Sequence, residues 1–490
     1  MTGPQLSHAR ELISEASRLY RGSIGIKQAI ADCDERTRQP LRIAFSGSLK
    51  AGKSTLLNAL VGDEIAPSDA TECTKVVTWY RHAHAPSAVA WRESEGVSES
   101  SPVIIDRSGR NLAFHLGSRT ASDIDCIEVG WPSESLEKTM LIDTPGMSSL
   151  SHDVSERTAR LLTPERGPSE ADAVVYLLRT LNDTDIRFLR EVGSRLGGET
   201  GPLGIIGVVA RADEIGAGRP DAMGAARDVA DRFAAELESA GLCQAVVPVS
   251  GLVALAARTL RESEFADLQR ISRVPAGDRD LALLSADRFT RSPDLPVAPE
   301  ARSALMNRFG VFGVRVAIGF LQDGVASANE LAQALLTHSG VDDLTELIAV
   351  HFRQRSEELR AHSALLTLRE ILSTSQVSGT GELLARVDRS LASDHGLEEL
   401  RVLARLKNKL SGVPDVSDLK RILGGRGTSP QARLGVPSGT PPDVVRQLAR
   451  DSALRWRSRA QHPLNDPFAA AAYRSAARSA EGLMEDAAPL

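Results

Sequence analysis

The chain has 490 residues, of which 42% are hydrophobic and 25% charged, a composition that is ordinary for a soluble globular protein and excludes a disordered or fibrous chain. At roughly 150 residues per domain, it is long enough for two to four domains. The formal net charge is −6, so the whole molecule is not a basic nucleic-acid binder, and no nucleic-acid partner is expected.

The cysteines and the N-terminus indicate a reducing compartment. Cys33, Cys73, Cys126 and Cys243 lie far apart without C-x-x-C spacing, which argues against a zinc site or a disulfide framework. The first residues lack the apolar stretch of a secretory signal, and no uncharged apolar run reaches about 18 residues. We therefore expect a cytoplasmic chain that does not span a membrane but can lie on one.

In chain order, the first predicted element is a helix over residues 5–34, followed by Pro40. From 41 to 250, short apolar runs alternate with helical patterns, which predicts an α/β domain with a mostly parallel sheet. A polar stretch over 92–122 predicts a hairpin insertion. The predicted strands are 41–45, 75–80, 87–91, 140–142, 173–178, 205–210 and 245–249.

Helical patterns dominate after residue 252. The longest, from Val341 to Leu372, keeps its apolar residues near one stripe with charges opposite. A single helix of this length would span about 48 Å, more than a compact domain needs. The pattern therefore predicts an elongated α-helical bundle, a stalk that projects from the α/β domain.

The most specific pattern is the loop between the first predicted strand and an apolar helix, which has the form G-x-x-x-x-G-K-S. Its glycines let backbone N–H groups turn around a phosphate, and the helix N-terminus adds positive potential. Lys53 is placed to reach the β- and γ-phosphates, and the Ser54 hydroxyl is a suitable ligand for Mg²⁺. The residues expected to contact the nucleotide here are Gly47, Ala51, Gly52, Lys53, Ser54 and Thr55.

A second motif, D-T-P-G, follows the strand at 140–142. The Asp143 carboxylate can hold Mg²⁺ through water, and the Gly146 N–H can sense a γ-phosphate. Alone this motif is also a plain turn, but its position after the phosphate loop favours the nucleotide interpretation. Between the two motifs, Thr71, Thr74 and Thr78 are candidates for a second Mg²⁺ oxygen, and Thr78 is discounted as a residue on a strand face.

The third motif, A-R-A-D, ends the strand at 205–210, where a guanine-reading [NT]-K-x-D motif would lie. The Asp213 carboxylate can accept from guanine N1–H and the exocyclic amine, a pair that adenine lacks, and the Arg211 stem can cover the base. Ala210 replaces the usual Asn or Thr, and a salt-bridged surface loop is the alternative interpretation. Ser250 and Gly251 fit a loop that closes over the base, so GTP or GDP is the expected nucleotide.

Together, GSLKAGKST, ATECTKVVT, DTPG and the degenerate RAD resemble the bacterial dynamin-like proteins, and in particular the mycobacterial isoniazid-inducible group, over nearly the whole chain. The resemblance implies a GTPase head on a helical stalk, with GTP or GDP and Mg²⁺ as cofactors and membrane remodelling as the output. It assigns phosphate binding to Lys53 and the second switch to Asp143 and Gly146. Thr74 matches the switch threonine, so the implied Mg²⁺ ligands are Ser54, Thr74 and Asp143.

Two positions depart from eukaryotic dynamins, which carry Gln and Ser where this chain has Leu49 and Lys50. Leu49 cannot orient water by a hydrogen bond, so slow turnover is expected. Lys50 is a candidate catalytic residue, because its charge could stand near the β/γ bridge in place of an arginine finger or a potassium ion. The alternative function is a nucleotide-binding scaffold with little hydrolysis that partners an active homologue. A ribosome-assembly GTPase is disfavoured because no basic RNA-binding module is evident.

The expected domains are N-terminal helices over 1–36 that join the bundle, a dynamin-type GTPase domain over 37–270, neck helices over 271–340, and a stalk over 341–490 with a membrane-contacting tip near 397–426. The tip is predicted from residues 400–410, where the leucines share one helix face and Arg405, Lys407 and Lys409 lie on the remaining surface. An ordinary stalk helix is the alternative, and the rival apolar segment 308–321 is interpreted as a buried neck helix. The expected partners are the anionic inner face of the plasma membrane and an oligomer with itself or a related dynamin-like protein.

Overall fold

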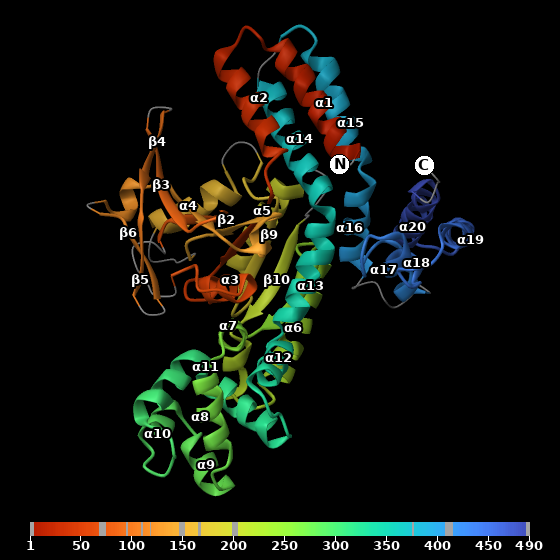
Figure 1. Ribbon diagram of the computed structural model, residues 1–490. Helices are drawn as coiled ribbons and strands as arrows, with labels where there is room; N and C mark the ends of the chain where they lie inside the picture. The colour runs from red at the N-terminus through yellow and green to blue at the C-terminus, as the bar shows by residue number, and fades with distance from the viewer. Residues whose placement is uncertain are drawn as a thin grey trace.

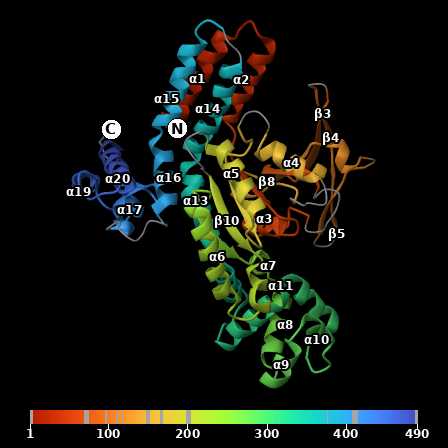
Figure 2. The ribbon, with the colours of Figure 1, turned by 180° about the vertical axis from the view of Figure 1, so that it is seen from behind.

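A central β-sheet with helices on both faces is flanked by further helices at three sides (Figures 1 and 2). The computed structural model describes residues 4–67, 75–94, 97–108, 111–117, 119–146, 152–164, 168–197, 204–374, 377–406 and 415–486.

The sheet is mixed, with both parallel and antiparallel strand pairs. Its strands are β1 (Leu41–Gly47), β2 (Val77–His82), β3 (Ser87–Ser94), β4 (Val97–Pro102), β7 (Cys126–Trp131), β8 (Thr139–Asp143), β9 (Ala173–Leu178), β10 (Ile205–Ala210) and β11 (Ala245–Val249). Within the described residues their order is β11-β10-β9-β1-β8-β2-β7-β3-β4, with β5 (Ile104–Ser108) and β6 (Asn111–His115) in a separate hairpin. On one side of the sheet β11, β10, β9, β1 and β8 run parallel, and the other side combines antiparallel pairs with the parallel pair β2–β7.

The prediction of a mostly parallel sheet is thus correct only for part of it. Five strand pairs run parallel. The pairs β2–β8, β3–β7 and β3–β4 run antiparallel. The sequence pattern missed β7, because Glu128 and Gly130 interrupt its apolar residues. The predicted hairpin insertion over 92–122 is observed as two hairpins, β3–β4 and β5–β6.

Alternation along the strands builds a core on each face of the sheet. In β1, Ile43 and Phe45 join one core and Ala44 joins the other. The first core includes residues of α3 (Lys53–Val61), α7 (Gly251–Arg258) and α13 (Val341–His351), and the second includes residues of α4 (His152–Leu162), α5 (Asp183–Gly197) and α6 (Ala222–Ser239). Both faces are therefore covered, and the ends of the strands remain for loops that bind a ligand.

The first predicted helix is in fact two helices. α1 (Pro4–Leu19) and α2 (Ile24–Arg36) are separated by a turn at Gly22 and Ser23, and Ser23 has the extended backbone of an N-cap residue. The turn sends α2 back along α1 (Figure 1). The apolar stripe alone could not show this break, because it continues on both sides of the turn.

The predicted helix from Val341 to Leu372 is also broken. α13 ends at His351, a short 3₁₀ turn covers Arg353–Arg355, and α14 runs over Ser356–Thr374. Phe352 leaves helical geometry, with φ −117° and ψ −59°, and its side chain is buried in the core under the sheet. Tertiary packing therefore sets the position of the break, because the segment contains neither glycine nor proline.

The two N-terminal helices pack with α14 and α15 (Thr380–Ser393) into a bundle at one end of the molecule (Figure 1). The bundle has a core of its own, which includes Leu12, Tyr20, Leu368 and Leu383. The N-terminal helices thus form one unit with α14 and α15, whereas α13 packs in the core of the sheet.

At the opposite end lie α8 (Glu262–Ser272), α9 (Ala276–Ala282), α10 (Ala286–Arg291), α11 (Pro299–Gln322) and α12 (Ala328–His338) (Figure 1). Among the described helices, α11 meets the length and hydropathy of a membrane span, but half of its apolar window is buried inside the protein. It is kinked at Gly310, and Arg315 donates to the carbonyl oxygens of Gly218 and Leu283. These contacts favour the predicted buried helix, and one such helix is weak evidence for a span.

The remaining helices form a group beside the sheet: α16 (His395–Leu406), α17 (Val416–Ile422), α18 (Pro430–Leu434), α19 (Pro442–Ala460) and α20 (Pro467–Asp486). The leucine face predicted to contact lipid is buried here, because Leu400, Leu403 and Leu406 all belong to the protein's cores. Lys407 and Lys409 lie outside the described residues. The apolar face of this segment is thus used for packing, as in the alternative interpretation.

Candidate nucleotide-binding site

The predicted phosphate loop joins the end of β1 to the start of α3. Gly52 adopts φ 91° directly before the first helical residue, Lys53, and a Cβ atom there would meet nothing within 4 Å, so the space in front of the helix is open. Gly47 has a second reason to be glycine, because a Cβ would lie 2.4 Å from the carbonyl oxygen of Leu177 in β9. The packing of the sheet and the conformation of the loop therefore both require glycine at position 47.

Lys53, Ser54 and Asp143 converge at this loop. The Ser54 hydroxyl donates to Oδ2 of Asp143 at 2.7 Å, although 89 positions separate the two residues. The Lys53 side chain is buried, and its Nζ lies 3.4 Å from the carbonyl oxygen of Ser48. Burial lowers the pKa of Lys53, and the nearby Asp143 opposes that shift. Burial raises the pKa of Asp143, opposed by Lys53 and by the Ser54 hydrogen bond.

The donors at this point suit Mg²⁺. Oδ1 of Asp143 is buried without a hydrogen-bond partner among the described residues, and the Ser54 oxygen lies beside the same carboxylate. Hard oxygen atoms of this kind are the ligands that Mg²⁺ prefers, usually with several waters retained. The residues present therefore fit the ion that the phosphate loop implies.

The D-T-P-G segment packs directly on the phosphate loop. Thr144 donates to the carbonyl oxygen of Phe45 through both its N–H and its hydroxyl. A Cβ at Gly146 would lie 2.8 Å from the Cα of Leu49, so only glycine fits this approach. The segment can thus respond to what the loop holds, as a phosphate sensor must.

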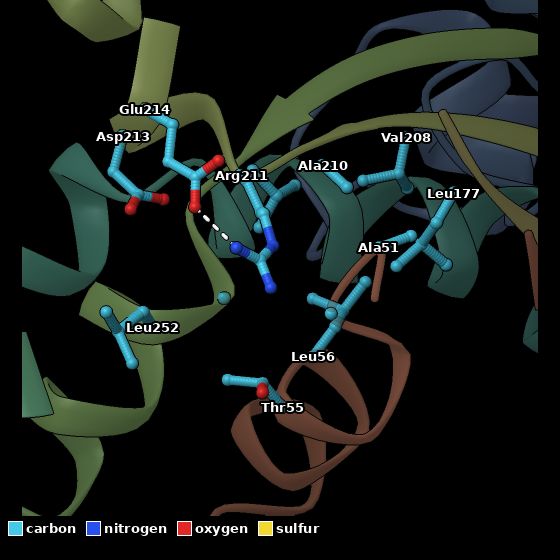
Figure 3. Close-up of a pocket in the computed structure, with 13 residues that line it drawn as sticks. Ala51, Thr55, Leu56, Leu177, Val208, Ala210, Arg211, Asp213, Glu214 and Leu252 are labelled. Atoms are coloured by element: carbon cyan, nitrogen blue, oxygen red, sulfur yellow. Dashed lines mark hydrogen bonds and ion pairs between the residues drawn. The ribbon is translucent and has the colours of Figure 1, made fainter. Parts of the chain in front are cut away.

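The base-reading residues line one pocket with the phosphate loop (Figure 3). Its walls include Ala51, Gly52, Thr55, Leu56, Leu177, Val208, Ala210, Arg211, Asp213, Glu214, Val249, Gly251 and Leu252. Arg211 reaches across the pocket toward Thr55 and Leu56, with Asp213 and Leu252 on one side of it (Figure 3). The structure therefore brings together three motifs that the chain separates by about 200 positions.

Asp213 is held by the loop that was predicted to close over the base. Burial raises the pKa of Asp213, and a hydrogen bond with the Ser250 side chain opposes the shift. Ser250 caps α7 by accepting from the N–H of Val253, and its own N–H donates to the carbonyl oxygen of Ser339 at 2.9 Å. The base loop is thus anchored on the junction between α12 and α13.

Two residues that support the site, Glu214 and Arg179, were not identified from the sequence. Glu214 pairs with Arg211 at 2.5 Å and with Arg179 at 3.0 Å, so it holds Arg211 over the pocket. Arg211 has φ 53°, a left-handed conformation that points the side chain inward. The position of Glu214 directly after Asp213 was the available signal, but the motif itself assigns no role to that position.

The remaining predicted residues are placed as follows. Lys50 is exposed and adopts φ 59°. Thr78 is buried within β2, as expected for a residue on a strand face. Thr71 and Thr74 lie outside the described residues, so the position of the switch threonine stays a prediction. Within the described part of the chain, no cluster of three or more His, Cys, Asp or Glu side chains forms a separate metal site.

Comparison with known proteins gives consistent results. The profile described as the Dynamin family matches residues 43–207. The isoniazid-induced protein IniC of Mycobacterium tuberculosis is 47% identical over 487 residues, which cover 97% of this chain and 98% of IniC. The isoniazid-induced protein IniA of the same organism is 29% identical over 286 residues, which cover 56% of this chain and 41% of IniA.

Among solved structures, a protein described as an oligomerised bacterial dynamin pair that senses and tethers membranes is 13% identical. The match has a TM-score of 0.33 and covers 93% of this chain and 61% of that one.

Proposed function

Because this chain belongs to the dynamin family, as a relative of IniC over almost its whole length, we propose that it is a Mg²⁺-dependent GTPase with slow turnover that couples its nucleotide state to membrane contact. One observation carries the proposal. The Ser54 hydroxyl, the buried Lys53 and Oδ1 of Asp143, which has no partner in the described part of the chain, meet at the N-terminus of α3 beside a pocket that contains Asp213.

The chain's own residues have distinct tasks in this function. The loop N–H groups and Lys53 bind the β- and γ-phosphates, while Ser54 and Asp143 hold Mg²⁺. Bound Mg²⁺ supplies positive charge that offsets the charge on the phosphates during transfer to water. Asp213 accepts from the guanine edge, and Arg211 covers the base. Thr74 is proposed to position the attacking water.

The slow turnover follows from the loop side chains. Leu49 is 53% exposed at the position where a glutamine would orient water, and a leucine offers that water no hydrogen bond. The same observation favours the second candidate, a nucleotide-binding scaffold that partners an active dynamin-like homologue. The two functions differ in the chemical step and not in the binding step.

Membrane contact is proposed at the free end of the helical bundle, because Leu400, Leu403 and Leu406 are buried. Ile24 is 90% exposed at the start of α2, directly after the turn that follows α1. The exposed cations Arg18, Arg21 and Lys27 lie within six positions of it in the chain, and no acidic residue occurs between positions 17 and 31. The neighbouring turn before α15 is tied to this one by Tyr20 and Thr380, whose hydroxyls lie 3.0 Å apart. An apolar side chain among cations suits an anionic lipid surface.

The GTPase proposal is tested by single-turnover assays with GTP and ATP, with and without Mg²⁺. We expect hydrolysis of GTP alone, dependent on Mg²⁺, at well under about 1 per second. Binding of GTP without hydrolysis would favour the scaffold. A protein that binds no guanine nucleotide in the presence of Mg²⁺ would contradict both functions.

The membrane proposal is tested by sedimentation with anionic and with neutral liposomes. Ile24→Asp and Lys27→Glu are expected to abolish binding to anionic liposomes. Leu464→Asp is the matched control, because Leu464 is 87% exposed in the C-terminal helix group. Equal sedimentation of the Ile24 and Leu464 variants would place the contact elsewhere.

Light scattering with and without GTP tests the proposed oligomer. Cell fractionation tests whether the protein lies at the inner face of the membrane.

A further inference from the structure

A second cavity lies on the side of the molecule formed by α9 and α11, outside the nucleotide pocket. It has a volume of about 510 Å³, a size typical of small-molecule sites, and it is partly open to solvent. Its walls come from α9 and the residue after it, from the end of α11, from the last residue of α12 and from Pro220, which follows the A-R-A-D loop. Arg279, Leu283, Gly319, Phe320 and His338 are the lining residues that matter here.

The cavity contains an aromatic surface with one unused polar atom. The His338 ring stacks on Phe312 and meets the edge of Phe320, with both pairs of ring centroids 5.8 Å apart. Its Nε2 atom is buried and has no hydrogen-bond partner among the described residues. Burial, reinforced by Arg227, lowers the pKa of His338, so the ring is neutral near pH 7. A buried polar atom without a partner is costly, and a ligand or water that bonds it recovers that cost.

A positively charged side chain, that of Arg279, lines the same cavity. The Arg279 side chain is only 10% exposed, and its described hydrogen bonds are long, at 3.3 Å to Asp280 and 3.4 Å to the Ser272 carbonyl oxygen. Arg315, in contrast, donates two short hydrogen bonds, to carbonyl oxygens at 2.6 Å. Arg279 is thus the buried cation with capacity for an added acceptor. Asp280 and Asp323 also line the cavity, and a bound acceptor would share Arg279 with the largely exposed Asp280.

We propose that this cavity binds a small amphipathic anion, whose apolar body lies against Phe320 and whose acidic group reaches Arg279, with a polar atom bonded to Nε2 of His338. The apolar side chains of Leu283 and Phe320, the buried Arg279 guanidinium and the unpartnered Nε2 of His338, within the described residues, match that chemistry. A medium-chain carboxylate is the simplest molecule of this class.

The cavity is joined to the base loop by two residues. His338 is followed by Ser339, whose carbonyl oxygen accepts from the N–H of Ser250. Gly340 comes so close to the base-loop strand that a Cβ would lie 2.3 Å from the carbonyl oxygen of Pro248. A ligand that shifts His338 would therefore also shift Ser339 and Ser250, the residues through which Asp213 is held. This regulatory step rests on the proposed function, whereas binding of the anion does not.

The experiment measures binding of decanoate to the full chain by calorimetry, with decanol as the uncharged probe. Gly319→Leu should weaken decanoate binding at least tenfold, because a Cβ at Gly319 meets nothing within 4 Å and the added side chain fills the cavity. Gly224→Leu is the matched control, an exposed helical glycine in α6 with the same open surroundings. It should bind decanoate as the unmodified chain does.

Arg279→Met should remove the preference for decanoate over decanol, and it remains informative if the Gly319 variant fails to fold. His338→Phe keeps the ring stack and should weaken decanoate binding several-fold. No binding of decanoate, or binding that neither Gly319→Leu nor Arg279→Met alters, would overturn the site. If decanoate binds but the affinity for a fluorescent GTP analogue is unchanged, the regulatory link is wrong while the site stands.

Discussion

Nη1 of Arg355 lies 2.8 Å from Oε2 of Glu399, and the two side chains are only 1% and 2% exposed. Arg433 pairs with the same carboxylate, and Ser479 donates to it at 2.6 Å. Arg355 occupies the break between α13 and α14, while Glu399, Arg433 and Ser479 belong to the C-terminal helix group. One buried carboxylate therefore joins that group to the point where the chain leaves the sheet.

Replacement of this carboxylate should destabilise the fold. Burial would raise the pKa of Glu399, but Arg433, Arg355 and Ser479 hold it at about 2. We expect Glu399→Gln to lower the free energy of unfolding at pH 7 by roughly 3 kcal/mol, because two guanidinium groups stay buried without a counter-charge. Urea unfolding measures this change. Glu398→Gln, whose side chain is 45% exposed, should cost little.

The pH dependence of this effect has a defined sign. The folded-state pKa of Glu399 lies below its ordinary value of 4.5, so its contribution is complete above about pH 5. It is lost as the pH falls from there toward 2. The stability difference between the unmodified chain and Glu399→Gln should thus be constant from pH 7 to 5 and shrink below 4.5. A difference that grows on acidification would contradict the assignment.

Ser54→Ala should weaken Mg²⁺ binding more than nucleotide binding. The substitution removes the hydroxyl that contacts Asp143 and leaves the loop N–H groups and Lys53 in place. We expect at least a tenfold rise in the Mg²⁺ concentration needed for half-maximal GTP hydrolysis, with a smaller change in GDP affinity without the ion. Thr55→Ser is the matched control in the next position. Equal loss of GDP and Mg²⁺ binding would indicate a damaged loop.

Much of the sheet could be predicted because buried parallel strands are short apolar runs. The runs at 173–178, 205–210 and 245–249 coincide with β9, β10 and β11. The helix breaks at Ser23 and Phe352 could not be predicted, since the first needs a turn inside a continuous stripe and the second depends on where Arg355 finds its partners. The same limit applies to 400–410, because an amphipathic pattern does not reveal whether protein or lipid covers its apolar face.

In the site, residues with a motif could be predicted and residues that support them could not. Lys53, Ser54, Asp143 and Asp213 each have a chemical task that restricts the residue type at a fixed position. Glu214 acts only through Arg211, and its partner Arg179 comes from another strand end, so no local pattern identifies it.

Lys50→Ala tests the proposed catalytic charge. Lys50 is exposed, carries φ 59° and leads into the nucleotide pocket through Ala51. If its ammonium group stabilises the β/γ bridge, Lys50→Ala should lower the single-turnover rate at least tenfold and change GTP affinity little. Lys138→Ala, an exposed lysine outside the loop, is the control. An unchanged rate would remove Lys50 from the reaction.

Asp213→Asn should change the base preference, because an amide donates where the carboxylate accepts. The variant still accepts from guanine N1–H through its amide oxygen but sets its NH2 against the 2-amine, so GTP affinity should fall by about 2 kcal/mol, or roughly thirtyfold. Xanthosine triphosphate has a carbonyl in place of the amine and should gain affinity. Competition with a fluorescent nucleotide measures both changes. Glu214→Gln separates the two carboxylates that line the pocket: if Glu214 read the base instead, the preference would change in that variant and persist in Asp213→Asn.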